Sequence, residues 1–510
     1  MCGIFGGVNV DFNEAKDCIN LIKRGEDGIT IKKINDKIVF ASRRHLVKKS
    51  GYEEDNKNLS DQPYFSKDKK IALIFNGEFF NFNDYKKDLE KKNVIFNSEG
   101  DTEVFLKLYE TKGINFLNDK KIDSLFAIAI VDLNIGKIFI TRDWPGRVPL
   151  YYYKSDKKFI FSSELKAFKK IKNLSLQDPV ELEPGSIIEY DIEKNQIKQK
   201  KFFKPLTNLI SKSENEIHSI AKSIDQKLDE SAKNRTMGDV PICTMLSGGI
   251  DSVLTTFYVF KNIDFKKVSF QPKSYVFFVD GFNSQDLYKA REAANGFEEI
   301  GLQLQEVKAS KEKILNDLPN IIHSFEMRKI KSLSFYPLPI YWYLAPEMRK
   351  DGFKVTIGGH GVDELLGAYD SWKELNKPHE LQIRTISRLA FINNIYYNML
   401  KRASIIFMNR GPIEARFPFL NQNICEYLLS VDKKWLTLNK DNAKVMVSLI
   451  EKNSSNKLEA LSKLLDQYLK NEDLFYKNNS EEIINNIKKI FWKFPLIVSS
   501  FYASKRSFLK

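Results

Sequence analysis

The sequence predicts a carboxy-terminal α/β domain with a doubly wound parallel sheet, preceded by an α+β domain built largely from paired strands. Three observations support this. The chain, with 510 residues, is long enough for two or three domains with separate cores. Short apolar strands alternate with helical segments after residue 217, as in a parallel sheet. Before residue 205, apolar segments follow one another around short turns, as in antiparallel strands. We therefore expect domains at 1–205 and 217–510, with a linker between them.

The composition is that of a globular chain, with 43% hydrophobic and 13% aromatic residues. Four scattered cysteines favour a reducing compartment over a disulfide framework, and five dispersed histidines form no zinc pattern. No signal peptide and no membrane-spanning run is found, so we expect a cytoplasmic protein that binds no membrane. The net charge of +14 is spread among acidic residues along the whole chain. It predicts a solvated surface, and nucleic-acid binding is the alternative, which requires steeply salt-dependent affinity.

The amino-terminal domain opens with a cysteine, Cys2, directly after Met1 and before an apolar strand over residues 3–8. Removal of Met1, which we expect before such a small side chain, would put a thiol and a free α-amine on one residue. An α-amine has a pKa of about 8, so a fraction is neutral near pH 7 and can activate the thiol. The alternative is a cysteine that merely lies near the start.

Further along, residues 71–75 predict a strand that ends in Asn76-Gly77-Glu78. Such a trio can present a side-chain amide and a backbone N–H to an oxyanion, and a carboxylate to a substrate ammonium. Residues 125–132 and 137–143 predict two strands paired around a turn, and a lysine-rich strand to Phe203 closes the domain.

The opening Cys-Gly-Ile-Phe-Gly resembles the class II glutamine amidotransferases, and Arg24-Gly25 with Asp27 and Gly28 is similar to their Arg-Gly-Pro-Asp turn, although Glu26 replaces the proline. This resemblance implies an N-terminal-nucleophile hydrolase sandwich in which Cys2 is the nucleophile and Asn76 and Gly77 form the oxyanion hole. The glutamine-binding residues that it implies are Arg44, Asn76, Gly77, Glu78 and Asp101. Arg43 is the alternative to Arg44, because His45 interrupts the usual Arg-Leu pair.

The carboxy-terminal domain is organised around a glycine loop, Leu246-Ser247-Gly248-Gly249-Ile250-Asp251-Ser252, between an apolar strand and an apolar helix. Consecutive glycines let backbone N–H groups approach a ligand, and the helix N-terminus adds partial positive charge, so the loop suits phosphate. The lysine that grips the β and γ phosphates in the Gly-x-x-x-x-Gly-Lys pattern is missing. The loop is therefore predicted to hold pyrophosphate, and a purely structural turn is the alternative.

This loop resembles the Ser-Gly-Gly-x-Asp-Ser loop of the ATP pyrophosphatases, and the Asp-Val-Pro at residues 239–241 narrows the resemblance to the glutamine-hydrolysing asparagine synthetases and their relatives. Residues 358–369 are similar to the second loop of that family, which faces the first across ATP. The resemblance implies ATP and Mg²⁺, with Asp251 and Asp363 on the metal ion. The implied ATP-binding residues are Leu246, Ser247, Gly248, Gly249, Asp251, Ser252, Val279, Gly358 and Gly359.

Two features depart from the family pattern. His360 stands where asparagine synthetases carry a glutamate and β-lactam synthetases a tyrosine, so we expect His360 and Glu364 at the acyl-acceptor site. His360 could act as a base, contact a different carboxylate, or be inert. After Leu420 we find no Arg-x-Lys loop, and the tail over residues 453–510 is rich in lysine and asparagine.

The predicted function is that of an asparagine synthase (glutamine-hydrolysing)-like ligase with small-molecule substrates: glutamine, ATP, and aspartate or another carboxylate. No nucleic-acid partner is expected, and a homodimer is left open. One alternative is the same chemistry on another carboxylate of a specialised biosynthetic pathway. The other is a glutaminase or regulatory protein with an inactive synthetase half.

Overall fold

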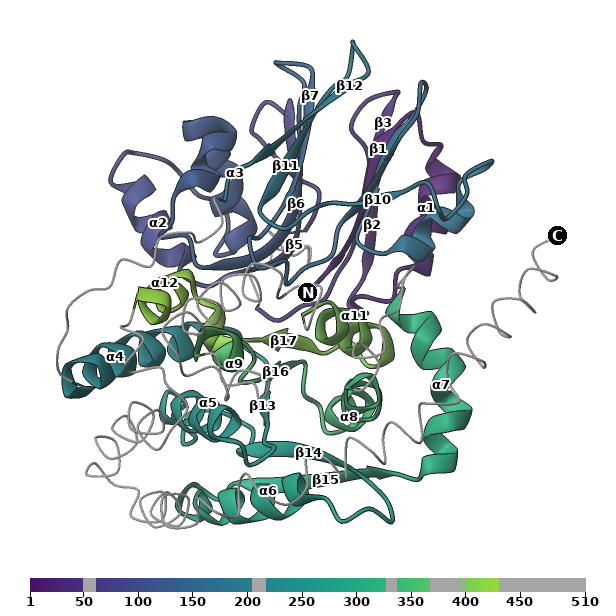
Figure 1. Cartoon of the computed structure of the whole chain (residues 1–510). Coiled ribbons are helices and arrows are strands. Elements are labelled where there is room, and N and C mark those ends of the chain that lie inside the picture. Colours follow the sequence, from purple (N-terminus) through teal and green to yellow (C-terminus); the bar gives the residue numbers. More distant parts are fainter. Residues whose placement is uncertain (49–60, 204–216, 327–336, 367–394, 396–399, 431–510) are drawn as a thin grey trace, which may run out of the picture. The chain divides into compact units, whose positions relative to one another are not determined.

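The computed structural model describes residues 1–48, 61–203, 217–326, 337–366, 395 and 400–430 (Figure 1). Residues Met1–Leu449 form one compact unit. The predicted linker and the lysine- and asparagine-rich tail lie outside the described residues. Over the ranges just given, no helix combines the length and the apolar character that are needed to cross a bilayer.

The amino-terminal half contains two antiparallel sheets of six strands each. The first has the order β10-β8-β9-β1-β3-β2 and the second the order β12-β11-β7-β6-β5-β4. The strands of the first sheet are β1 (Gly3–Val8), β2 (Ile29–Lys33), β3 (Ile38–Arg43), β8 (Tyr151–Lys154), β9 (Phe159–Ser162) and β10 (Val180–Glu181). Those of the second are β4 (Tyr64–Phe65), β5 (Ile71–Phe79), β6 (Ser124–Asp132), β7 (Lys137–Arg142), β11 (Ser186–Asp191) and β12 (Gln196–Lys201).

Strand β5 explains how the two sheets form a sandwich. Ala72 and Ile74 point into a core that they share with residues of the first sheet, such as Ile4 and Phe40. Leu73 and Phe75 point the other way, into a second core beneath helices. Because successive side chains of a strand point to opposite faces, the apolar run Ile71–Phe75 of β5 is buried on both sides.

Helices cover the outer face of each sheet (Figure 1). They are α1 (Phe12–Leu21) and η2 (Leu165–Lys170) beside the first sheet, and α2 (Phe82–Glu90), α3 (Asp101–Lys112) and η1 (Gly113–Asn118) beside the second. The predicted α+β sandwich is confirmed. One boundary was wrong: Asn76, Gly77 and Glu78 lie inside β5, because pairing with β6 continues as far as Phe79 opposite Ser124.

The carboxy-terminal half contains a parallel sheet of five strands in the order β15-β14-β13-β16-β17. The strands are β13 (Ile242–Met245), β14 (Lys273–Val279), β15 (Gln303–Ala309), β16 (Val355–Ile357) and β17 (Glu414–Arg416). The helices are α4 (Ile217–Arg235), α5 (Ile250–Lys261), α6 (Gln285–Asn295), η3 (Glu298–Ile300), α7 (Lys311–Phe325), α8 (Leu338–Lys350), α9 (Val362–Leu366), α11 (Lys401–Arg410), η7 (Pro418–Leu420) and α12 (Gln422–Ser430). Helices α5 and α6 lie on one side of the sheet and α8 and α11 on the other (Figure 1), which confirms the doubly wound α/β fold.

The two halves are joined by buried polar contacts. Arg235 at the end of α4 forms a two-pronged ion pair with Asp123, in which Nη2 and Oδ1 are 2.7 Å apart. At another place, Arg24 Nη2 donates to the backbone oxygen of Ser404 on α11 over 2.8 Å. The division into domains at 1–205 and 217–510 stays a prediction, because both sides of it belong to one compact unit.

Candidate functional site

The candidate nucleophile, Cys2, lies directly before β1 and is buried, with 8% of its surface exposed. The backbone N–H of His45 donates a hydrogen bond to Cys2 Sγ over 3.4 Å. Burial raises the pKa of the Cys2 thiol, and the N-terminal amine opposes this shift without cancelling it. The thiol is therefore protonated near neutral pH, so a nucleophile at this position needs a base beside it.

The predicted oxyanion residues lie one sheet away from the strand that follows Cys2. Ser163 Oγ joins the two sheets, because it accepts from Ile4 N over 2.9 Å and from Asn76 Nδ2 over 3.1 Å. The amide of an asparagine can be turned over and a hydroxyl rotates, so Ser163 can equally donate to Asn76 Oδ1 and leave Nδ2 to an oxyanion. At Gly77, φ is +153° and any Cβ would overlap the backbone oxygen of Leu125, which restricts the position to glycine.

Two carboxyl groups lie at the end of this strand, that of Glu78, which is buried, and that of Asp101, which is half-buried. Burial raises the pKa of Glu78 well above its ordinary value, and the charges of Glu414 and Asp101 raise it further. Burial also raises the pKa of Asp101, although its carboxylate accepts a hydrogen bond from Phe79 N over 3.0 Å. A substrate ammonium beside these groups would relieve the repulsion, which fits the predicted contact with the amino group of glutamine.

The two candidate arginines have different surroundings. Arg43 Nε donates to the backbone oxygen of Gly25 over 2.8 Å, which ties this side chain to a turn. The guanidinium of Arg44 forms an ion pair with Asp61 and lies near enough to the Cys2 thiol to lower its pKa. This arrangement favours Arg44 as the residue that receives the α-carboxylate of glutamine.

Strand β17, at one edge of the parallel sheet, lies close to the start of the chain. The amine of Met1 forms a buried ion pair with Glu414, the first residue of β17, and Arg416 Nε donates to the same carboxylate over 2.7 Å. Burial alone would raise the pKa of Glu414, but the amine and the Arg416 guanidinium lower it to about 2. The residues predicted to bind and hydrolyse glutamine therefore lie near β17, the edge strand of the parallel sheet.

The two glycine loops meet at the carboxyl edge of the parallel sheet. Strands β13 and β16 are parallel neighbours, with Thr244 opposite Ile357, so the loops that follow them emerge side by side. A Cβ on Gly359 would lie 2.8 Å from the backbone oxygen of Asp251. The second loop thus touches the first, at the edge where ligands of such sheets bind.

The first loop has the geometry of an anion site. Gly248 has φ +78°, and its missing Cβ leaves room for the backbone of Lys289 on α6. Ser252 Oγ accepts from Ser247 N over 3.2 Å and donates to Gly249 O over 2.8 Å, which fixes the turn. Helix α5, twelve residues long, begins directly behind it, so its positive end lies at the loop.

The remaining predicted nucleotide and metal ligands lie around this loop. Leu246 is buried and donates its N–H to Tyr275 O over 3.0 Å, and Val279 ends β14, the adjacent strand. Asp363 belongs to α9, and its side chain lies outside the described part of the chain. Among the described side chains, no group of three or more metal-ligating residues is found. Mg²⁺ commonly keeps several waters and takes one or two carboxylates plus substrate phosphates, so Asp251 beside a phosphate loop fits this ion.

His360, at the expected acceptor site, lies near Tyr341 of α8, Arg402 of α11 and Phe417. Its Nε2 lies 2.8 Å from the hydroxyl of Tyr341 on α8, and its ring contacts the ring of Phe417 with centroids 4.7 Å apart. Burial and then the charge of Arg402 on α11 lower the pKa of His360 to about 4. Glu364 on α9 is buried and raises the pKa of Tyr341. With this pKa His360 is neutral but only weakly basic at physiological pH, and the weak basicity argues against the predicted role as a general base.

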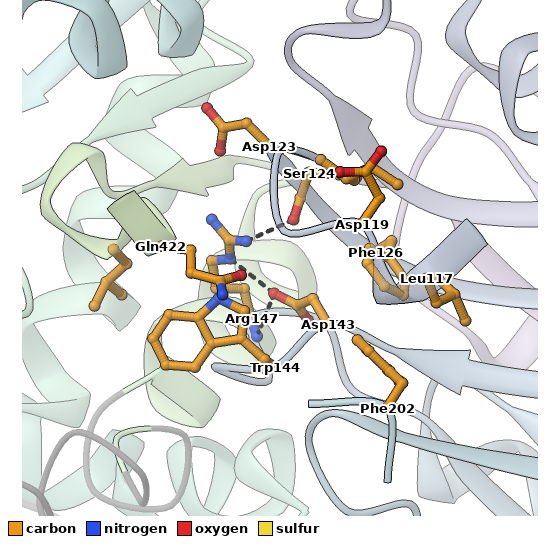
Figure 2. A pocket seen from close by; sticks show the side chains of 12 residues that line it. Leu117, Asp119, Asp123, Ser124, Phe126, Asp143, Trp144, Arg147, Phe202 and Gln422 are labelled. Atoms are coloured by element: carbon orange, nitrogen blue, oxygen red, sulfur yellow. Dashed lines mark hydrogen bonds and ion pairs between the residues drawn. The ribbon is translucent and has the colours of Figure 1, made fainter. Parts of the chain in front are cut away.

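A small pocket lies elsewhere, between the ends of β6 and β7 and the segment around η7 and α12 (Figure 2). Arg147 crosses it, donating from Nε to Asp143 Oδ2 over 2.7 Å and from Nη2 to Ser124 O over 2.6 Å. Its volume of about 30 Å³ is far below the roughly 300 Å³ at which small-molecule pockets begin. This pocket is therefore not a site for glutamine, ATP or an acceptor.

Comparison with known proteins agrees with this arrangement. A model of the glutamine amidotransferase domain matches residues 1–222, and a model of the asparagine synthase family matches residues 223–387. The chain belongs to the family of the glutamine-hydrolysing asparagine synthetases. Like other members of that family, it joins an amidotransferase domain, which contains Cys2, to a synthetase domain, which contains both glycine loops.

Individual relatives in this family are distant. A putative asparagine synthetase of Methanocaldococcus jannaschii is 28% identical over 72% of this chain and 66% of its own length. Asparagine synthetase B of Escherichia coli is 25% identical over 85% of this chain and 75% of its own. Among solved structures, a glutamine phosphoribosylpyrophosphate amidotransferase from B. subtilis is 16% identical, with a TM-score of 0.33 over 60% of this chain and 81% of its own.

Three residues of the site, Asp61, Tyr341 and Arg402, were not predicted. Tyr341 and Arg402 lie in the first turns of α8 and α11, the helices that precede β16 and β17. Such helices run antiparallel to the strands, so their first turns lie at the carboxyl edge of the sheet. Polar residues in the first turn of a helix that precedes a strand of the parallel sheet were the signal that could have identified both. Asp61 has no comparable signal.

Proposed function

We propose that the protein is a glutamine-dependent ligase that converts a carboxylate into its amide. The α-amine of Cys2, freed by removal of Met1, takes the proton of the thiol, and the thiolate attacks the side-chain amide of glutamine. The proton passes to the nitrogen, ammonia leaves, and water hydrolyses the resulting thioester to glutamate. At the glycine loops, a carboxylate oxygen of the acceptor attacks the α-phosphorus of ATP and pyrophosphate leaves. Ammonia then attacks the acyl carbon, AMP leaves with the bonding electrons, and the nitrogen loses a proton to give the amide.

The residues divide between the two half-reactions. Cys2 is the nucleophile, the Asn76 side chain and the Gly77 N–H hold the oxyanion, and Arg44, Glu78 and Asp101 orient glutamine by its α-carboxylate and ammonium. The first glycine loop binds the phosphates through its N–H groups and the positive end of α5. Mg²⁺, when bound at Asp251 and Asp363, neutralises phosphate charge.

The contact of Gly359 with Asp251 is the observation that supports this proposal most strongly. It brings the two glycine loops together at the carboxyl edge of β13 and β16, which is what a nucleotide held between them requires. Strand β17, beside β16, supplies the Glu414 carboxylate that pairs with the amine of Met1, the residue before Cys2. Ammonia would thus be released beside the edge strand of the sheet whose carboxyl ends activate the acceptor, and a path closed to water would keep it unprotonated.

Aspartate, giving asparagine, is the first acceptor to test, because the named relatives are asparagine synthetases. A different small-molecule carboxylate is the second candidate. It is favoured by the neutral Tyr341–His360 pair, which replaces the carboxylate that the family carries at this position.

The test is a screen of carboxylates for ATP-dependent pyrophosphate release, with ammonia supplied. Cys2→Ala should abolish glutamine use while ammonia still supports amide formation, and Cys18→Ala, a buried cysteine of α1, is the matched control. Asp251→Ala should stop pyrophosphate release and leave glutamine hydrolysis in place. Loss of both activities in Cys2→Ala, with normal folding, would contradict two separate sites.

A further inference from the structure

A tyrosine and a histidine form a partly buried, hydrogen-bonded pair at the carboxyl edge of the parallel sheet. The hydroxyl of Tyr341 lies 2.8 Å from His360 Nε2, and 5% of Tyr341 is exposed. The ring of Phe407 packs edge-on against Tyr341 at 5.1 Å, and that of Phe417 lies 4.7 Å from His360. Aromatic contacts from α11 and from the segment after β17 therefore hold both partners in place.

The two ring nitrogens of His360 have different neighbours. Nε2 is engaged by Tyr341, whereas Nδ1 lies beside Gly358, where a Cβ would come within 3.4 Å of it. The next residue, Gly359, is the one that touches Asp251. The second nitrogen of His360 is thus on the side of the nucleotide loops.

The charges around the pair determine its protonation. Burial and Arg402 lower the pKa of His360 to about 4, and burial raises the pKa of Tyr341. At neutral pH the phenol keeps its proton and the imidazole is neutral, so the phenol O–H can donate to Nε2. A neutral imidazole that accepts at Nε2 carries its proton on Nδ1. That N–H is a donor and suits an anion.

We propose that Tyr341 is a positioning residue for the acceptor half-reaction, because its hydroxyl holds His360 as the Nδ1–H tautomer and directs that N–H to the carboxylate of the acceptor. The inference rests on the proposed function and adds the group that orients the substrate before ATP is attacked. The guanidinium of Arg402, in the first turn of α11, adds positive charge near the pair. Glu364 on α9 is the buried acidic group that faces the pair.

The test compares Tyr341→Phe with Tyr343→Phe in the full chain. Both changes remove one phenol oxygen from α8, but the hydroxyl of Tyr343 bonds to Asp317, 2.8 Å away, and not to His360. Nitrogen NMR of the ligand-free protein labelled at histidine reports the tautomer, and the His360→Gln spectrum identifies the signal. We expect Nδ1–H in the wild type and in Tyr343→Phe, and the Nε2–H form that free histidine prefers in Tyr341→Phe.

Kinetics supply the second measurement, with ammonia as nitrogen donor and the best carboxylate from the screen. Tyr341→Phe should raise the KM for the acceptor about tenfold, the effect of one buried hydrogen bond, while the KM for ATP and glutamine hydrolysis stay unchanged. An Nε2–H tautomer in the wild type overturns the inference, whether or not the variant folds. An unchanged KM for the acceptor in a folded Tyr341→Phe protein also overturns the inference. If the wild type releases no pyrophosphate with any carboxylate, the proposed function is refuted instead. The NMR measurement still shows which nitrogen of His360 carries the proton.

Discussion

Asp61 is expected to compete with glutamine for Arg44. The carboxylate of Asp61 is paired with the guanidinium that is predicted to bind the α-carboxylate of glutamine, so the pair must open before glutamine binds. Replacing Asp61 by Asn keeps the shape of the side chain and removes its charge. We therefore expect the KM for glutamine to fall in Asp61→Asn. The kcat should not change, because Asp61 contacts no reacting atom.

The size of the effect follows from the exposure of the pair. The side chain of Arg44 is 18% exposed and that of Asp61 is 51% exposed. Ion pairs this accessible contribute about 0–1 kcal/mol, so the KM should decrease by at most about fivefold. Glutamate release at varied glutamine measures it, and Asp88→Asn, which removes an exposed acid paired with Lys91, is the matched control. An unchanged or higher KM in Asp61→Asn would show that Asp61 does not compete with glutamine for Arg44.

Three more predictions concern the two half-reactions. Gly359→Ala should slow pyrophosphate release about 5- to 150-fold and spare glutamine hydrolysis, because its Cβ would lie 2.8 Å from Asp251 O and overpacking costs about 1–3 kcal/mol. Gly77→Ala should do the reverse, abolishing glutamine hydrolysis while ammonia-dependent synthesis continues in the folded protein. The KM for glutamine should rise as the pH falls. Glu78 and Asp101 have raised pKa values in the folded protein and so gain protons at a higher pH than ordinary carboxyl groups, and a protonated pair no longer attracts an ammonium. A pH profile of glutamate release measures this, and a KM that stays flat below pH 7 contradicts it.

The features that could be predicted from the sequence are those that depend on residues close together along the chain. The strand, glycine loop and helix around Gly248 follow one another within about twenty residues, so pattern and turn chemistry identify them together. The end of β5 was misplaced, since polar residues look like a strand end and only pairing with β6 carries the strand to Phe79. The contact of Tyr341 with His360 depends on how α8 packs beside β16. No short-range pattern encodes that packing.

Helix α11 explains why the two half-reactions share one compact unit. Its first turn carries Arg402, which acts on the Tyr341–His360 pair, and two residues later Ser404 accepts hydrogen bonds from the buried guanidinium of Arg24 in the amino-terminal half. Moving the halves apart would break both hydrogen bonds, and a hydrogen bond to a charged group contributes about 1.5–3 kcal/mol. The ion pair of Arg24 with Glu164, within the amino-terminal half, would remain. These contacts therefore favour an arrangement in which the two halves stay together during turnover.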